Sequence, residues 1–239
     1  MTTVLVVAAL GAVIFWSLRS GAKTALAGIG LYELFFLFIS SAFLGDLFET
    51  VFVLLRTGIL MSRSSLLYAP LSLVWGLGAV LMTLILFPLA QKGIAALFAG
   101  GVILGGGFEY MASLVLEMTT HRLFWDYSRM PFNLDGRTNL LFALFWGAAG
   151  VFWVKLAAPA LLRLLDKIPL RKGHAVALAA ALFLTADMAL SAAALLRMEE
   201  RSRGMVPSNQ MEEVLDVLYT DDWLEHRYQN MQLPGETPF

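Results

Sequence analysis

Residues 93–117, with the sequence GIAALFAGGVILGGGFEYMASLVLE, decide the fold, because they are long and apolar enough to cross a lipid bilayer as one helix. A membrane-spanning helix needs about 20 predominantly apolar residues. The run shows no alternation of apolar and polar residues with a period of two, which a barrel strand would require. Only helices and closed barrels satisfy their backbone hydrogen bonds in hydrocarbon. The stretch therefore predicts an all-α protein, a polytopic bundle of membrane helices.

Apolar blocks on both sides of this stretch extend the prediction to about six transmembrane helices. We expect them at residues 2–18, 28–55, 66–90, 93–117, 138–162 and 174–196. The first block lacks a basic beginning and a clear cleavage site, so we interpret it as a membrane helix, with a signal peptide as the alternative. An even number of spans predicts both termini on one side of a cell membrane. The basic loop residues favour the outside.

The composition agrees with this class and excludes several others. Of the 239 residues, 59% are hydrophobic and only 15% are charged, and the mean hydropathy is +0.73. The net charge of −1 argues against a nucleic-acid partner. The absence of cysteine excludes thiol catalysis, disulfides and zinc–cysteine sites. The three histidines lie far apart, and neither HExxH nor GxxxxGK[ST] occurs, so we expect no metal, no cofactor and no built-in ATPase.

The chain divides into a transmembrane bundle, residues 1–198, and an amphipathic C-terminal tail, residues 199–239. Asn209 followed by Glu212 predicts a helix start of the capping-box kind. Apolar residues then recur with helical spacing at Met211, Val214, Leu215, Leu218 and Tyr219. Thr220 can begin a second short helix. We interpret the tail as an ordered cap on the protein or at the lipid interface, or as a docking element for a partner.

The loop at residues 124–137, FWDYSRMPFNLDGR, is rich in aromatic, acidic and arginine side chains. We expect it to be ordered and packed against the membrane end of the bundle. Trp125 and Tyr127 suit a belt at the membrane interface, or else a wall for a ligand. The Asp135-Gly136 pair predicts a turn with positive φ.

Charged side chains within the apolar segments are the strongest candidates for function. Carboxylates interrupt these segments at Asp46, Glu49, Glu109, Glu117 and Asp187. Each costs at least about 2.5 kcal/mol at the bilayer centre, so such residues face the bundle interior and pair or protonate. They indicate either a polar substrate site or internal ion pairs that fix helix packing. Arg63 and Arg137 are the expected partners of Glu49 and Glu109, or alternatively the grip on an anionic ligand.

Glycines crowd the helix that carries Glu109. Gly101 and Gly105 have the spacing that allows close contact between membrane helices. The run of residues 105–107 next to the glutamate can alternatively unwind the helix and expose its backbone to a ligand.

These residues also carry a resemblance to a known family. The matching pieces are Gly45-xxx-Glu49-Thr50, Arg63 to Pro70 with Trp75-Gly76 and Gly78, Glu109-Tyr110, Trp125-Asp126-Tyr127-Ser128, Phe132 to Arg137, Trp146-Gly147, Asp221-Asp222 and Asn230-Met231. The sequence resembles the bacterial membrane proteins described as putative ABC-transporter type IV, or CmpB-like, permeases, and more distantly the vertebrate TMEM229-type proteins. The resemblance implies a multi-span protein of the bacterial inner membrane. It departs at Ser62-Arg63-Ser64, where the family has Asn-Arg-Gly, and at Ala69-Pro70, where it has Gly-Pro.

Three functions follow from these patterns. The first is a permease that binds or transports a small polar or amphipathic substrate. Its predicted binding residues are Glu49, Arg63, Glu109, Trp125, Asp126, Asn133 and Arg137. The second is a membrane enzyme acting on lipid-linked substrates, with Asp126 or Glu109 as the acid or base. The third is an accessory subunit that binds a partner through its tail. Expected partners are membrane lipid, a separate ATPase or accessory subunit, and a second copy of the chain.

Overall fold

The computed structural model describes residues 29–231, which are helical apart from loops and one short hairpin. The helices are α2 (Leu31–Thr57), α3 (Leu73–Leu86), α4 (Ile94–Thr120), α5 (Leu140–Phe152), α6 (Ala158–Leu165), α7 (Leu170–Ser202), α8 (Gln210–Leu218) and α9 (Asp221–Arg227). A 3₁₀ helix, η1 (Phe87–Lys92), extends α3, and a π-helical turn, η2 (Trp153–Ala157), joins α5 to α6. Strands β1 (Asn133–Leu134) and β2 (Thr138–Asn139) form an antiparallel hairpin.

The described residues contain five helical segments that are long and apolar enough to cross a membrane. These are Leu31–Thr57, Leu73–Lys92, Ile94–Thr120, Leu140–Leu165 and Leu170–Ser202. The prediction of an all-α, multi-pass membrane protein is confirmed at this level. The block predicted at residues 2–18 lies outside the described residues, so the total of six and the placement of the termini remain predictions.

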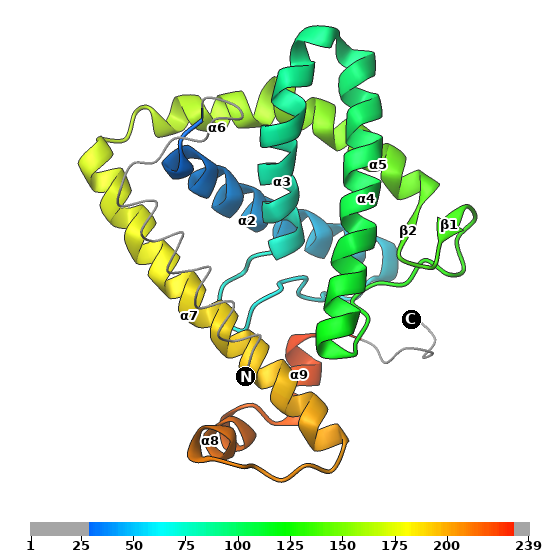
Figure 1. Ribbon diagram of the computed structural model, residues 1–239, viewed down its shortest axis with the longest axis vertical. Coiled ribbons are helices and arrows are strands. Elements are labelled where there is room, and N and C mark those ends of the chain that lie inside the picture. Colours follow the sequence, from blue (N-terminus) through cyan, green and yellow to red (C-terminus); the bar gives the residue numbers. More distant parts are fainter. Residues whose placement is uncertain (1–28, 232–239) are drawn as a thin grey trace.

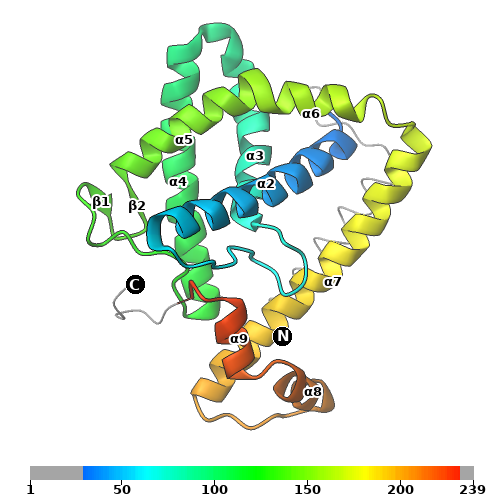
Figure 2. The same ribbon diagram turned by 180° about the vertical axis from the view of Figure 1, so that it is seen from behind.

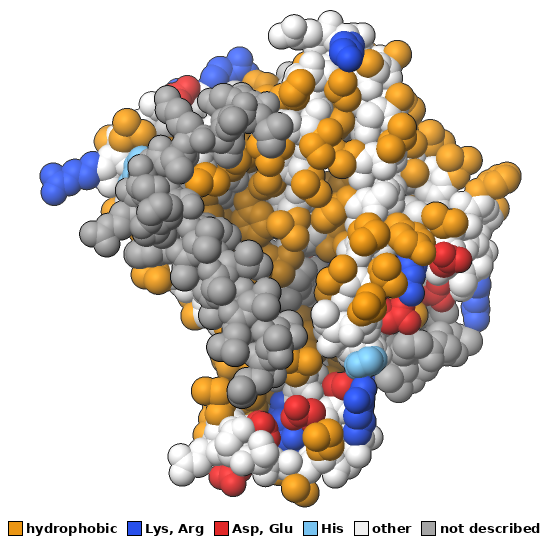
Figure 3. Space-filling view, viewed as in Figure 1, with side chains coloured by type: hydrophobic (Ala, Val, Ile, Leu, Met, Phe, Trp, Pro, Cys, Tyr) orange, Lys and Arg blue, Asp and Glu red, His pale blue; other side chains and the backbone are white. Residues whose placement is uncertain are grey.

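The helices cross one another rather than forming a parallel bundle. In Figure 1, α3 and α4 stand side by side as a hairpin, while α2 and the α5–α6 helix cross it and α7 closes a triangle with them. The view from behind shows α2 and the α5–α6 helix on the same side of the hairpin (Figure 2). The main packing contacts join α4 to α5 and α2 to α3. Apolar side chains cover the middle of the face seen in Figure 3, and charged ones gather toward its ends.

The third span begins later than its composition predicts, at Leu73 instead of near residue 66. Pro70 lacks a backbone N–H and disfavours helix before it. The loop ahead of α3 instead finds its hydrogen bonds elsewhere. Asp187 of α7 accepts the N–H of Ala69 at 2.7 Å, and Oγ of Ser191 accepts the N–H of Leu67 at 3.0 Å. Tertiary contacts therefore override the apolar run at this point.

The fifth span contains a π-helical turn that the sequence pattern did not predict. Pro159 follows the turn directly and stands in the first residues of α6. A proline inside a helix removes one hydrogen bond and crowds the carbonyl four residues earlier, and one wider turn relieves that crowding. The span thus remains continuous from Leu140 to Leu165.

Gly101 and Gly105 of α4 serve packing. The helix is unbroken from Ile94 to Thr120, so the alternative of an unwound segment at residues 105–107 is wrong. A Cβ atom on Gly101 would lie 3.0 Å from Cα of Gly147, and one on Gly105 would lie 2.2 Å from Cβ of Trp146. The predicted close contact through Gly101 and Gly105 is confirmed, and α5 is the helix that uses it.

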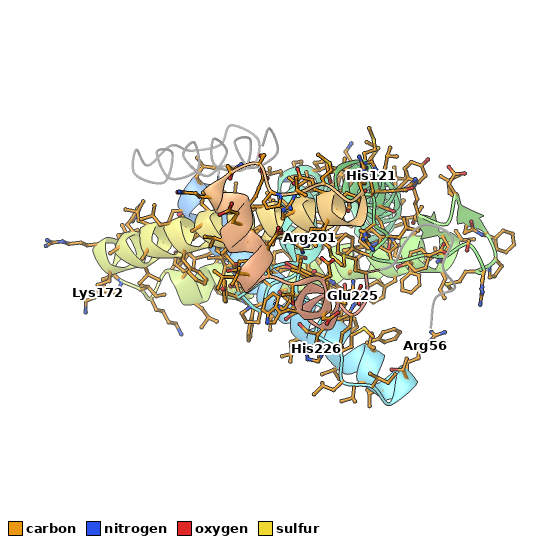
Figure 4. All side chains as sticks on the ribbon, turned by 90° about the horizontal axis from the view of Figure 1, so that it is seen from below. Arg56, His121, Lys172, Arg201, Glu225 and His226 are labelled. Atoms are coloured by element: carbon orange, nitrogen blue, oxygen red, sulfur yellow. The ribbon has the colours of Figure 1, made fainter. Side chains whose placement is uncertain are left out.

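The tail folds back onto α7 and onto the loop before α3. Asn209 caps α8 and Thr220 caps α9, as the sequence predicts. Leu215 and Tyr219 are buried against α7, whereas the other members of the predicted apolar stripe, Met211, Val214 and Leu218, are exposed. In the view from below (Figure 4), Lys172 lies at the outer edge of the molecule and Arg201 lies near its middle, beside the tail.

Arginines at the end of α7 hold the tail by ion pairs. Nε of Arg197 donates to Oδ1 of Asp216 at 2.8 Å, and Nη1 of Arg201 donates to the same atom at 2.6 Å. Arg201 also pairs with Asp221. The hydrogen bonds from Arg197, followed by those from Arg201, lower the pKa of Asp216 from its ordinary value.

We predict that Gly105→Ala destabilises the protein by about 1–3 kcal/mol, the usual cost of overpacking a filled interior. The reason is the contact with Trp146. Gly107→Ala is the matched control, because nothing lies within 4 Å of the position a Cβ would take there. Thermal unfolding in detergent followed by tryptophan fluorescence measures both. Equal melting temperatures for the two variants would contradict the packing account.

We also predict that the tail loosens in acid. Because the pKa of Asp216 is lowered in the folded state, the unfolded chain takes up the proton first. The stability contributed by this carboxylate is complete above about pH 4 and is lost as the pH falls through the folded-state pKa. Hydrogen exchange of α8, corrected for intrinsic rates, should accelerate in that window. Asp216→Asn should show fast exchange already at neutral pH, whereas the exposed Glu213→Gln should not.

Candidate functional site

Glu49 of α2 is the first of two carboxylates that organise the interior. Its Oε2 accepts a hydrogen bond from Nε of Arg63 at 2.9 Å, and its Oε1 accepts one from the indole N–H of Trp75 at 2.5 Å. The side chains of Arg63 and Glu49 are 17% and 29% exposed, so the pair is largely shielded from solvent. The predicted pairing of Glu49 with Arg63 is confirmed.

Glu109 of α4 is the second carboxylate, and only 6% of its surface is exposed. Its Oε2 accepts from the hydroxyl of Thr138 at 2.7 Å, and its Oε1 accepts from the phenol of Tyr127 at 3.0 Å. Burial and the nearby Glu109 raise the pKa of Tyr127 well above its usual range, so the phenol stays protonated as a donor. Among the described residues, no cation forms an ion pair with Glu109.

Two tryptophans connect the carboxylates. The rings of Trp75 and Trp146 lie 5.3 Å apart, centre to centre. Trp75 bonds to Glu49, and Trp146 interacts with Glu109.

Arg137 pairs with a different acid from the one the sequence suggested. Its Nη2 lies 2.5 Å from Oε2 of Glu117, and its Nη1 donates to the hydroxyl of Ser113 at 3.3 Å. Both partners lie beyond Glu109 toward the end of α4. The loop places Arg137 at that end of the helix, whereas the β2 residue Thr138 faces Glu109. The expected pairing of Arg137 with Glu109 is therefore replaced by one with Glu117.

The other predicted binding residues hold the loop at residues 124–137 in shape. The indole N–H of Trp125 donates to the carbonyl of Arg137 at 2.9 Å. The carboxylate of Asp126 accepts from the N–H and the hydroxyl of Ser128, at 2.8 and 2.9 Å. The amide of Asn133 donates to the carbonyl of Met130 at 2.7 Å. Their role in binding a substrate stays a prediction.

The turn and the packing of this loop agree with expectation. Asp135 and Gly136 both have positive φ, 51° and 68°, which the Asp-Gly pair predicts. The N–H of Tyr127 donates to the carbonyl of Gly136 at 2.7 Å and closes the loop on itself. Its contacts with α4 through Tyr127 and Thr138 show that the loop packs against the bundle.

The loop before α3 positions Arg63. Asp187 accepts hydrogen bonds from backbone N–H groups of this loop, and Arg227 of α9 donates to backbone carbonyls of the same loop. Nε of Arg227 bonds to the carbonyl of Leu67 at 2.8 Å, and Nη2 bonds to that of Leu66. The tail thus contributes directly to the framework that holds the Arg63–Glu49 pair.

Asp46 lies one helical turn before Glu49 and is 7% exposed. Its Oδ1 has no hydrogen-bond partner within the described part of the chain. Arg227 and Arg63 both act on its charge. Asp46 therefore adds negative charge to the same region without a direct ion pair.

An apolar cleft with a volume of about 450 Å³ lies against this region. It is bounded by α2, α3, α5 and the π-helical turn. Aromatic rings form much of its wall: Phe48, Trp75, Phe145, Trp146, Phe152 and Trp153. The volume falls in the range of sites for small organic molecules. For brevity we call it the aromatic cleft.

Trp75 and Trp146 were not among the residues predicted for the site, although the sequence contains a signal for them. Each is followed by a glycine, and each packs on another glycine of a neighbouring helix. A Cβ atom on Gly45 would lie 2.1 Å from Trp75, and one on Gly105 would lie 2.2 Å from Trp146. Two Trp-Gly pairs facing glycine-bearing helices indicate rings placed deep between helices.

The comparisons with known proteins agree with the resemblance noted above. A family model described as "Putative ABC-transporter type IV" matches residues 36–192. No curated protein matches the chain, and no solved structure does. The matched region contains Glu49, Arg63, Glu109, Trp75 and Trp146. It does not include the tail.

We predict that Arg63→Ala destabilises the protein by about 3 kcal/mol, near the lower end of the range for breaking a buried ion pair. We expect a cost near the lower end because both side chains of the pair are partly exposed. Adding Glu49→Gln to Arg63→Ala should recover part of the loss, because no unpaired charge then remains. A double-mutant cycle on melting temperatures in detergent measures the coupling. Strictly additive effects would show that the pair contributes nothing.

Proposed function

Because the chain belongs to the family described as "Putative ABC-transporter type IV", we propose that it binds and transports a small polar or amphipathic substrate at Glu49, Arg63 and Glu109. Glu109 carries the proposal. It stands near the middle of a membrane-spanning helix, is buried, and is held by neutral donors. Ionisable residues inside a membrane protein are costly and mark pathways for substrates or ions.

The loop at residues 124–137 forms the cover of this site in our proposal. Its residues Trp125, Asp126, Asn133 and Arg137 would act by shaping that cover and by contacting the substrate as it enters. Tyr127 supports this role, because its backbone N–H closes the loop on itself and its phenol donates to Glu109. Movement of the loop would therefore change the hydrogen bonds of the buried carboxylate.

We further propose that a separate subunit supplies any ATP hydrolysis. The family description names ABC transporters, a class driven by ATP, whereas these 239 residues contain no GxxxxGK[ST] motif. The tail is the candidate contact for such a subunit. It is exposed along Met211, Val214 and Leu218 and joined through Arg227 to the loop that holds Arg63.

The alternative functions make different demands on the same residues. A membrane enzyme acting on lipid-linked substrates needs an acid or base that meets its substrate. Both carboxylates accept hydrogen bonds from neighbouring side chains, but Glu109 is buried within a membrane-spanning helix and Asp126 lies in a loop, so Glu109 is the stronger candidate for that role. An accessory subunit needs no substrate access at Glu109.

Access from both sides of the membrane tests the transport proposal. The chain has no cysteine, so single cysteines can be introduced without background. We predict that Thr138→Cys, beside Glu109, reacts with a membrane-impermeant thiol reagent from either face of oriented vesicles, because a transport site opens to each side in turn. Labelling is measured by mass spectrometry of the intact protein.

The control is Thr57→Cys at the end of α2, which should react from one side only. Reaction of Thr138→Cys from a single side would argue for an enzyme or an accessory subunit. The absence of reaction from both sides, in protein that remains folded, would exclude an exposed transport site at Glu109.

A further inference from the structure

We propose that the aromatic cleft binds a hydrophobic organic cation, whose charge rests against the faces of Trp75 and Trp146. This inference rests on the proposed function and names a substrate class for the cleft that adjoins the proposed site.

The lining favours an organic ligand with a large apolar body. The rings of Phe48, Trp75 and Phe145 contact one another, with centres 5.6 to 6.2 Å apart. Trp146 adjoins both Trp75 and Phe145. Such a cluster of faces and edges is the environment in which cations with apolar substituents are recognised. An acyl chain would gain apolar contact here, but not the electrostatic attraction that a ring face offers to a cation.

Carboxylates polarise the indoles that form this wall. The N–H of Trp75 is engaged by Glu49, and Trp146 interacts with Glu109. Both rings nevertheless line the cleft. A carboxylate bound to the N–H adds negative charge at the edge of the ring, and the attraction of a cation to the ring face grows accordingly. Glu49 is neutralised by Arg63, so among the described residues the uncompensated negative charge behind this wall is that of Glu109, although neither acid lines the cleft.

The buried charges leave room for one more cation. Three acids lie in this region: Asp46, Glu49 and Glu109. Arg63 pairs with Glu49, whereas Arg227 is held by the carbonyls of the loop before α3. Arg137 is held by Glu117. In the described part of the chain Glu109 thus has only neutral donors, and charge interactions at low dielectric are strong. An anionic ligand is disfavoured by the same balance.

Binding of tetraphenylphosphonium to the purified protein tests the proposal. Tetraphenylborate is the matched probe, since it has nearly the same size and shape but the opposite charge. Both are measured by equilibrium dialysis in dodecyl maltoside, a neutral detergent without ammonium groups, with empty micelles subtracted. We expect saturable binding of one cation per chain, at least tenfold tighter than binding of the anion.

Variants then locate the binding site. Trp75→Leu and Glu109→Gln should each weaken binding of the cation about tenfold, the size of a desolvated cation–π or charge contribution. Trp75→Phe keeps the ring face and should lose less. Phe145→Leu stands at the edge of the cleft, with 38% of its surface exposed, and provides a variant that disturbs the fold least. Each variant is first checked for an unchanged elution profile and melting temperature.

Glu33→Gln is the matched control. Glu33 is an acid on the same helix, but it lines a smaller separate cleft of about 230 Å³ beside α6. Its removal should leave binding unchanged. Equal affinity for cation and anion, or loss of binding in Glu33→Gln but not in Trp75→Leu, would overturn the proposal. Displacement of the probe by a short-chain phosphatidylcholine at lower concentration than by tetrabutylammonium would likewise overturn it, in favour of a lipid headgroup.

Uptake of the cation into proteoliposomes is measured separately. Binding with the expected pattern but without uptake would support the cleft and contradict the transport role. Labelling of Thr138→Cys from both sides without binding of the cation would support the transport role and overturn the cleft assignment.

Discussion

A loop that enters a membrane bundle without helical structure needs partners for its backbone, and Asp187 meets this requirement for the loop before α3. An unpaired buried N–H costs about 1–3 kcal/mol. Asp187, with 3% of its surface exposed, accepts the N–H of Ala69. Ser191, one turn further along α7, accepts that of Leu67. These bonds fix the start of α3 and the position of Arg63. Asp187, an acid in the middle of an apolar helix, thus positions both the start of α3 and Arg63.

The same constraint accounts for the tail. Once Asp187 has accepted the N–H groups, the carbonyls of the loop still need donors, and Arg227 of α9 supplies them. The tail is held in place for this purpose by Asp216, which pairs with the arginines ending α7. The C-terminal tail, which is richer in polar residues than the spans, thus completes the hydrogen bonding of the loop before α3. Contacts made by a partner on α8 would reach Arg63 through this short series of bonds.

The sequence predicted what is local and missed what depends on packing. Span lengths, the caps Asn209 and Thr220, and the Asp-Gly turn all follow from neighbouring residues. The start of α3 does not, because Asp187 lies 118 residues from Ala69 along the chain. The partner of Arg137 could not be chosen either. Glu109 and Glu117 lie on one helix, and only the depth of the β1–β2 hairpin decides which acid meets the arginine and which meets Thr138.

Because Arg137 pairs with Glu117, Glu49 and Glu109 differ in their partners within the described part of the chain: Glu49 has an arginine and Glu109 has none. Glu49 has a fixed counter-charge in Arg63 and a fixed donor in Trp75, so removing its charge would leave the arginine unpaired. Glu109 is bound by hydroxyl groups, which stabilise a carboxylate without neutralising it and can also accept a hydrogen bond from a protonated one. Its charge can therefore change without stranding a partner. The cation-binding role that we propose requires such an acid, because its charge must be free to change as a charged molecule binds and leaves.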